Sequence, residues 1–195
     1  MSKSIIKISV TCILASLCLL LTSGCSSTEK KAKKVQKALV ANPSSVKFGN
    51  FKRVELKPTT IAKEHANNKA NKKSAATIDS MMQDQFRMMF PKAISLKENQ
   101  SYSKSAQRTL QVEPHIENIR IISGAARFWV GAMAGNSDII LKVTYRDSST
   151  GQVIANPQFS SKGNAWAGGW SMGASDNQVR DNVVREVMGY TQANK

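Results

Sequence analysis

The chain has 195 residues, and its 28 Lys and Arg against 13 Asp and Glu give a formal net charge of +15 at pH 7. All three cysteines lie within the first 25 residues, which excludes a disulfide within the remaining chain. About 150 residues follow position 43, enough for one domain with a hydrophobic core.

The first 24 residues predict a bacterial lipoprotein signal peptide. Two lysines precede an apolar run of about fourteen residues, Ile8–Leu21, whereas a membrane-spanning helix needs roughly 20. The run ends in Leu21-Thr22-Ser23-Gly24-Cys25. This segment resembles the bacterial lipobox, although its second residue is Thr where the family usually has Leu. The resemblance implies cleavage after residue 24 and attachment of a lipid, which palmitate labels, to the Cys25 thiol.

The residue after the lipidated cysteine bears on the choice of membrane. By the same resemblance, Ser26 rather than Asp indicates an outer-membrane lipoprotein that faces the periplasm. In a cell with a single membrane, the lipid would hold the protein at the outer face of the cytoplasmic membrane. The membrane is therefore a predicted partner, and nucleic acid is not expected because an exported, lipid-anchored protein rarely meets it.

Residues 25–43 form a predicted basic tether, and residues 44–195 form a predicted single domain. Residues 26–73 contain 13 Lys and Arg against 3 Asp and Glu, a net charge of +10, whereas residues 74–195 carry +3. A basic segment beside the lipid is attracted to an anionic bilayer. The other interpretation is a solvated tether whose lysines only keep it soluble.

The domain begins with a predicted strand over residues 46–56 that is irregular at Gly49. Polar residues follow, and a helix is expected to begin somewhere after Pro58. An amphipathic helix then ends at Pro91. Its four methionines suggest either a core stripe or an adaptable binding groove. The apolar residues that recur every three or four positions are Ile78, Met82, Phe86, Met89 and Phe90.

Alternating apolar residues predict two strands in the second half of the chain. The first covers residues 110–121 and is expected to be broken at Pro114. The second covers residues 138–146. Residues 147–151 are typical of a turn between antiparallel strands.

Residues 152–160 are predicted to return as the partner strand, with an interruption at Pro157. A final amphipathic helix is expected to be capped by Ser175 or Asp176. This order of elements predicts an α+β fold, with two amphipathic helices packed on one face of a mainly antiparallel sheet.

Few residues could support catalysis. His65 and His115 are isolated, and no cluster of Cys or acidic ligands suggests a metal site. No Ser lies in a nucleophile-elbow pattern. We therefore expect no enzymatic activity, no cofactor and no bound metal.

Gly124–Gly135 is a small, apolar and almost uncharged stretch. It is neither a P-loop nor a dinucleotide-binding loop, because a strand rather than a helix follows it. It either allows close backbone packing or forms a loop for self-association or membrane contact. Its candidate contact residues are Arg127, Phe128 and Trp129.

A second glycine-rich stretch, Trp166–Gly173, follows the predicted return strand. Tryptophans on such a loop cover an exposed sheet end, stack on sugars or lie at a bilayer interface. Its candidate contact residues are Trp166 and Trp170.

Taken together, these segments resemble the bacterial envelope lipoproteins catalogued as domain of unknown function 4410, over about Val46–Tyr190. The resemblance rests on Arg127 with the small-residue run to Gly135, on Asp147-x-x-x-Gly151, and on the glycine-rich loop with the final helix. It implies an exported α+β domain without an established activity, so no catalytic residue is carried over.

We expect a non-enzymatic binding or assembly module at the inner face of the outer membrane. It would associate with itself or with an envelope protein through the two glycine-aromatic stretches. Arg127 would serve as a core ion-pair partner or contact an anion. The alternative is a small-molecule or glycan-binding domain in which Trp166 and Trp170 stack on the ligand.

Replacing Cys25 should remove the lipid. Cells that express Cys25→Ser are expected to incorporate no labelled palmitate into this protein, because the lipid is attached through the thiol. The wild-type chain at the same expression level is the positive control. Label that persists in the Cys25→Ser protein would overturn the assignment.

Overall fold

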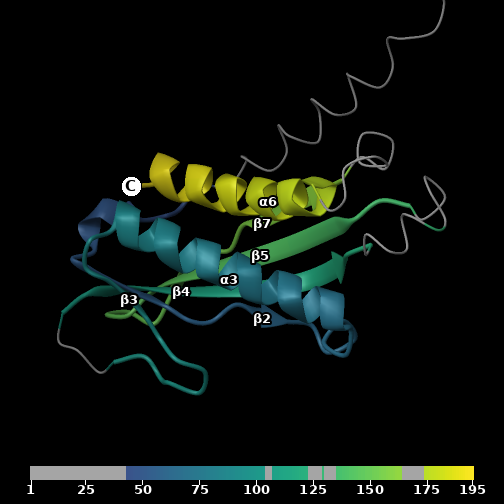
Figure 1. Ribbon diagram of the computed structural model, residues 1–195. Coiled ribbons are helices and arrows are strands. Elements are labelled where there is room, and N and C mark those ends of the chain that lie inside the picture. The colour runs from purple at the N-terminus through teal and green to yellow at the C-terminus, as the bar shows by residue number, and fades with distance from the viewer. Residues whose placement is uncertain (1–42, 104–106, 123–128, 130–134, 164–173) are drawn as a thin grey trace, which may run out of the picture. The chain divides into compact units, whose positions relative to one another are not determined.

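The structure, a computed structural model, describes residues 43–103, 107–122, 129, 135–163 and 174–195 (Figure 1). All of these residues belong to one compact unit. The predicted signal peptide and Cys25 lie outside the described residues. None of the described helices is both long and apolar enough to cross a bilayer.

One mixed sheet of seven strands forms the base of the fold. The central path runs β3-β1-β4-β5-β6, while β2 pairs with β4 and β7 pairs with β5. The strands are β1 (Arg53–Leu56), β2 (Thr60–Ile61), β3 (Ala93–Ser95), β4 (Thr109–Arg120), β5 (Asp138–Asp147), β6 (Val153–Ala155) and β7 (Gln158–Lys162).

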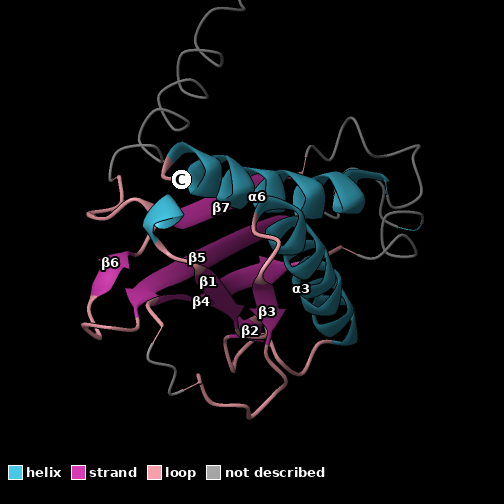
Figure 2. Cartoon of the chain, turned by 90° about the vertical axis from the view of Figure 1, so that its left-hand side faces the viewer, coloured by secondary structure: helices cyan, strands magenta, loops and turns pink. Residues whose placement is uncertain are grey.

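Two long helices, α3 (Lys69–Met89) and α6 (Ala174–Ala193), cover the same face of this sheet (Figures 1 and 2). The predicted α+β class with two helices is therefore confirmed. A short 3-10 helix, η1 (Phe48–Asn50), precedes β1. The predicted strand over residues 46–56 is thus wrong in its first half, where Phe48 is fully buried in a helical turn.

The prediction of a mainly antiparallel sheet is wrong for the first half of the domain. β1 is parallel to β3 and β4, and β2 is parallel to β4. Only the pairings of β5, with β4, β6 and β7, are antiparallel. For β1 and β3 the cause is α3, because a helical crossover returns the chain to the end where β1 began and lets the next strand run in the same direction. The connection from β3 to β4 returns the chain to that end again, so β4 is parallel to both.

Helix α3 begins at an asparagine cap and buries one stripe. The Asn68 side-chain oxygen accepts hydrogen bonds from the backbone N–H groups of Ala70 and Asn71, a favourable N-cap arrangement. Met82 and Phe86 of the predicted stripe are fully buried. The interpretation of that stripe as core is therefore confirmed.

Pro114 does not interrupt β4, contrary to the prediction. Its partner on β5 is Val143. The Val143 N–H points away from β4, because it donates to the Pro157 oxygen on the other side of β5. Pro114 and Val143 therefore form a pair without mutual backbone hydrogen bonds. On its other side, Pro114 lies opposite the gap between β1 and β2, whose pairings end at Val112 and resume at His115. The missing N–H therefore costs no ladder bond.

The remaining predictions for the second half agree with the structure in part. The turn after β5 closes with a hydrogen bond from the Gly151 N–H to the Asp147 carbonyl oxygen, with Gly151 at φ +70°. Pro157 separates β6 from β7 as predicted. Helix α6 begins at Ala174, so Asp176 lies within its first turn rather than at its cap.

Aromatic side chains fill the core between α6 and the sheet. The rings of Phe48 and Tyr145 stack at 4.6 Å, and Tyr190 packs against both. The Tyr145 hydroxyl shares a 2.8 Å hydrogen bond with the Thr191 hydroxyl. The buried polar group of this core is therefore satisfied, as burial requires.

Truncation of Phe86 tests the packing of α3. Phe86→Ala should lower the free energy of unfolding by about 3–5 kcal/mol, because it removes a fully buried ring and leaves a cavity. Met88→Ala is the matched control on the same helix, since Met88 is 68% exposed. Urea unfolding followed by circular dichroism measures both. Equal effects of the two substitutions would refute this placement of the helix.

Candidate functional site

Only one of the contact residues predicted from the sequence falls within the described structure. Trp129 is described, and its side chain is 82% exposed. The others lie outside the described residues: Cys25, Arg127, Phe128, Trp166 and Trp170. The described residues that flank the two glycine-aromatic stretches show from which part of the sheet each stretch leaves.

Both stretches are flanked by residues that meet at one end of the sheet, here called the loop end. Ile122 and Ser137 flank the first stretch, and Gly163 and Asp176 flank the second. The Ser137 hydroxyl accepts a hydrogen bond from the Ile122 N–H at 3.1 Å and donates one to the Asp176 carboxylate at 2.7 Å. The Ser137 carbonyl oxygen accepts from the Gly163 N–H at 2.7 Å. One buried serine therefore links the flanks of both stretches.

The loop end is also where both long helices begin. The Asn71 side chain in the first turn of α3 accepts a hydrogen bond from the Ile121 N–H at 3.3 Å. Arg180 in the second turn of α6 donates to the Ser74 hydroxyl of α3 at 2.9 Å. These bonds fix the helix starts to each other and to the end of β4. The loop end is thus a rigid platform from which both stretches leave.

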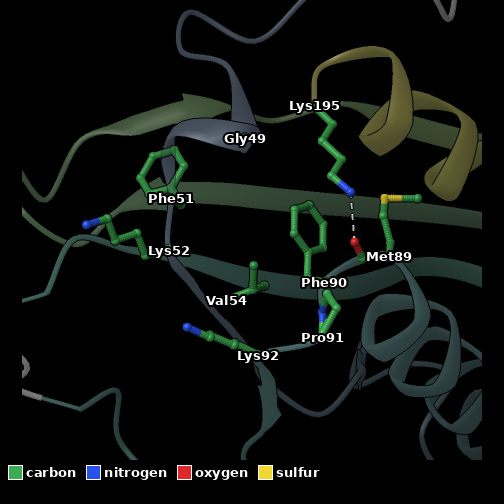
Figure 3. A pocket seen from close by; sticks show the side chains of 9 residues that line it. All are labelled: Gly49, Phe51, Lys52, Val54, Met89, Phe90, Pro91, Lys92 and Lys195. Atoms are coloured by element: carbon green, nitrogen blue, oxygen red, sulfur yellow. Dashed lines mark hydrogen bonds between the residues drawn. The ribbon is translucent and has the colours of Figure 1, made fainter.

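At the opposite end of the domain, a cavity of about 350 Å³ opens where α3 and α6 finish (Figure 3). We call this the pocket end. A volume of this size lies within the range of small-ligand sites. The nine residues that line the cavity are Gly49, Phe51, Lys52, Val54, Met89, Phe90, Pro91, Lys92 and Lys195.

The cavity has apolar walls and a cationic rim. Phe51, Val54 and Phe90 are buried, and none of the nine lining residues is acidic. Gly49 lets the chain pass the last turn of α6, because a Cβ at this position would lie 2.8 Å from the Lys195 carbonyl oxygen. The three cations of the rim are the lysines at positions 52, 92 and 195.

The three rim lysines differ in their partners. The Lys195 ammonium donates a hydrogen bond to the Met89 carbonyl oxygen at 2.9 Å and lies 5.2 Å from the centre of the Phe90 ring. Across the described residues, no hydrogen bond or ion pair engages the ammonium group of Lys52 or Lys92. In Figure 3 these two side chains point the same way, away from Lys195. They are the cations available to an anionic ligand.

Several groups have a shifted pKa for local reasons. Burial raises the pKa of Glu186 on α6, and burial together with the Glu113 carboxylate raises the pKa of the Tyr102 hydroxyl. Hydrogen bonds from Arg108 hold the pKa of Asp147 below its usual value. None of these three residues lines the cavity at the pocket end. Among the described residues, no group of three potential metal ligands occurs either.

Sequence reasoning found the loop end in part and missed the pocket end. The two glycine-aromatic stretches are visible in the sequence, but their meeting at Ser137 is not. The pocket combines residues from three segments up to 146 positions apart, Gly49 to Lys195. Its lysines are three of many in a basic chain, so no local pattern singles them out.

A family model described as domain of unknown function (DUF4410) matches residues 28–169. The chain therefore belongs to this family, as its resemblance indicated. No curated protein matches the chain.

Several solved structures are similar to the chain at low sequence identity. A PelC variant from Paraburkholderia phytofirmans, described as a dodecamer, is 14% identical with a TM-score of 0.50, covering 79% of this chain and 95% of its own. A second PelC dodecamer from the same organism is 12% identical with a TM-score of 0.49, covering 76% and 94%. A Xanthomonas campestris protein of family DUF330 is 10% identical with a TM-score of 0.42, covering 79% and 88%. At these identities the likeness concerns the fold alone.

Removal of the Ser137 hydroxyl should destabilise the loop end. Ser137→Ala removes the acceptor of the Ile122 N–H and the donor to the Asp176 carboxylate, and loss of a buried hydrogen-bonding partner costs about 1–3 kcal/mol of unfolding free energy. The Ile122 amide should also exchange with solvent faster. Ser101→Ala, at an exposed position, is the matched control. Unchanged stability and amide exchange in Ser137→Ala would contradict the role of this serine.

Proposed function

We propose that this member of the DUF4410 family is a non-catalytic lipoprotein of the bacterial cell envelope, a binding or assembly module whose loop end contacts a protein partner. The partner is a second copy of the chain or another envelope protein. A lipid on Cys25 would hold the module at the outer membrane, with the domain in the periplasm. The observation that carries the proposal is the Ser137 linkage of both glycine-aromatic stretches at one end.

The loop end has the properties of a contact surface. Trp129 exposes 82% of its side chain, and tryptophan is enriched among the residues that carry most of the binding energy in protein interfaces. The flanks of both stretches are held by hydrogen bonds to Ser137, so these flanks lose little conformational entropy when a partner binds. Phe128, Trp166 and Trp170 belong to the same two stretches and are further candidates for the contact.

Self-association is the favoured form of this contact. The PelC variant with the similar fold is described as a dodecamer, which motivates a test for assembly in this chain. The glycan-binding alternative through Trp166 and Trp170 stays a prediction, because both residues lie outside the described structure.

Photocrosslinking in cells tests the proposal. A photoreactive amino acid in place of Trp129 should yield covalent adducts with a second copy or a distinct envelope protein, identified by mass spectrometry. The matched control places the same amino acid at Gln192, an exposed position on the last turn of α6 at the opposite end. The proposal fails if position 129 captures no more protein than position 192 and the detergent-extracted protein is monomeric in analytical ultracentrifugation.

A further inference from the structure

We propose that the pocket end binds the anionic surface of the bilayer, with an acyl chain of an anionic phospholipid in the cavity and its phosphate between Lys52 and Lys92. This inference extends the lipid-anchored part of the proposed function and does not depend on the loop end. The domain would then stand on the membrane with its loop end directed away from it.

The chemistry of the cavity matches an amphipathic anion. Its walls are formed by Phe51, Val54 and Phe90, which suit a hydrocarbon chain. Its rim carries Lys52 and Lys92, whose ammonium groups have no partner among the described residues, and none of the lining side chains is acidic. A free phosphate would leave the apolar walls without a contact, and a neutral lipid would leave the lysines without one. An anionic phospholipid satisfies both.

Two exposed apolar residues are sequence neighbours of residues that line the cavity. Met88 is 68% exposed and precedes the lining residue Met89, while Ile94 is 39% exposed and lies two residues after Lys92. Apolar groups beside lysines are typical of surfaces that enter the boundary between headgroups and acyl chains. The same lysines would place their charges at the phosphate level, since long cationic side chains extend toward the polar layer.

The chain enters the domain at this same end. The Ser44 N–H donates to the Asn194 side chain at 2.8 Å, and the Lys47 ammonium donates to the Ala193 carbonyl oxygen at 3.3 Å. The beginning of the described chain therefore lies beside the last turn of α6, whose neighbour Lys195 lines the cavity.

The tether does not force this orientation by its length. Residues 25–43 can span about 60 Å when extended, so either end of the domain could reach a bilayer. The charge distribution favours the pocket end as the membrane-facing end. The tether residues 26–43 are basic, and they join the domain beside the cationic rim. Tether and rim then act on one surface, each lysine near the bilayer contributing about fivefold in affinity.

Vesicle binding tests the inference. The protein used is the chain from residue 25 onward with Cys25→Ser, so that neither signal peptide nor acyl group contributes. It should bind vesicles of phosphatidylglycerol and phosphatidylcholine and bind pure phosphatidylcholine vesicles poorly. Replacing both Lys52 and Lys92 with Gln should lower the partition coefficient for the anionic vesicles about 25-fold.

The matched control replaces Lys69 and Lys72 with Gln. Both are exposed lysines in the first turn of α3, at the loop end, and the change in net charge is the same. Circular dichroism and urea unfolding confirm that both double variants fold. An equal loss of binding in the two variants would show that net charge alone attracts the protein, and would overturn the pocket end as the membrane surface.

A second measurement examines the cavity itself. With methyl-labelled methionine, a lysophosphatidylglycerol that carries a nitroxide on its acyl chain should broaden the NMR signal of Met89 strongly and that of the fully buried Met82 little. An unaffected Met89 signal would reject the acyl-chain site. If the protein bound poly-glutamate through these lysines but did not bind anionic vesicles, its partner would be an acidic protein rather than a lipid. That result would overturn the inference. Crosslinking from position 129 reports on the loop end separately.

Discussion

β4 and β5 pair in antiparallel fashion from Leu110 and Asp147 at one end to Arg120 and Asp138 at the other, and the rest of the sheet is attached to this pair. β1 and β2 join through β4, whereas β6 and β7 join through β5. Because the side chains of paired strands alternate together, one face of the pair is mostly apolar from the Val112–Tyr145 pair to the Ile119–Ile139 pair. Both helices pack against that face, so the β4–β5 pair determines where the core lies.

The same pair gives the domain two chemically different ends. The β4–β5 connection carries the first glycine-aromatic stretch, and β7 returns along β5 so that the second stretch leaves from the same end, where Ser137 joins their flanks. Helices α3 and α6 both run from this end to the other and finish around the cavity with Lys52 and Lys92 at its rim. Contacts with a protein partner at one end and with a membrane at the other are therefore compatible within one domain.

Membership of the DUF4410 family and the likeness to PelC describe ancestry and fold rather than a binding partner. The residues at the two ends of the domain narrow the kinds of partner that each end could bind. Ser137 is buried and uses its hydroxyl and its carbonyl to link three other segments, which is a structural role that makes a stable platform. Lys52 and Lys92 make no such links among the described residues. Their ammonium groups, near apolar walls, would be stabilised by hydrogen bonds to an anionic partner.

Local patterns in the sequence determined most elements, because helical and strand periodicity depend on neighbours within a few residues. They correctly indicated the stripe of α3 around Met82 and Phe86, the strand β5, the break at Pro157 and the final helix. Strand direction depends instead on where a crossover returns the chain, so the parallel half of the sheet was not predictable from alternation. Pro114 fits within β4 only because its partner strands leave a gap beside it. Likewise, the cavity exists only where the ends of α3, α6 and η1 converge, and tertiary packing alone brings Lys52, Lys92 and Lys195 to one rim.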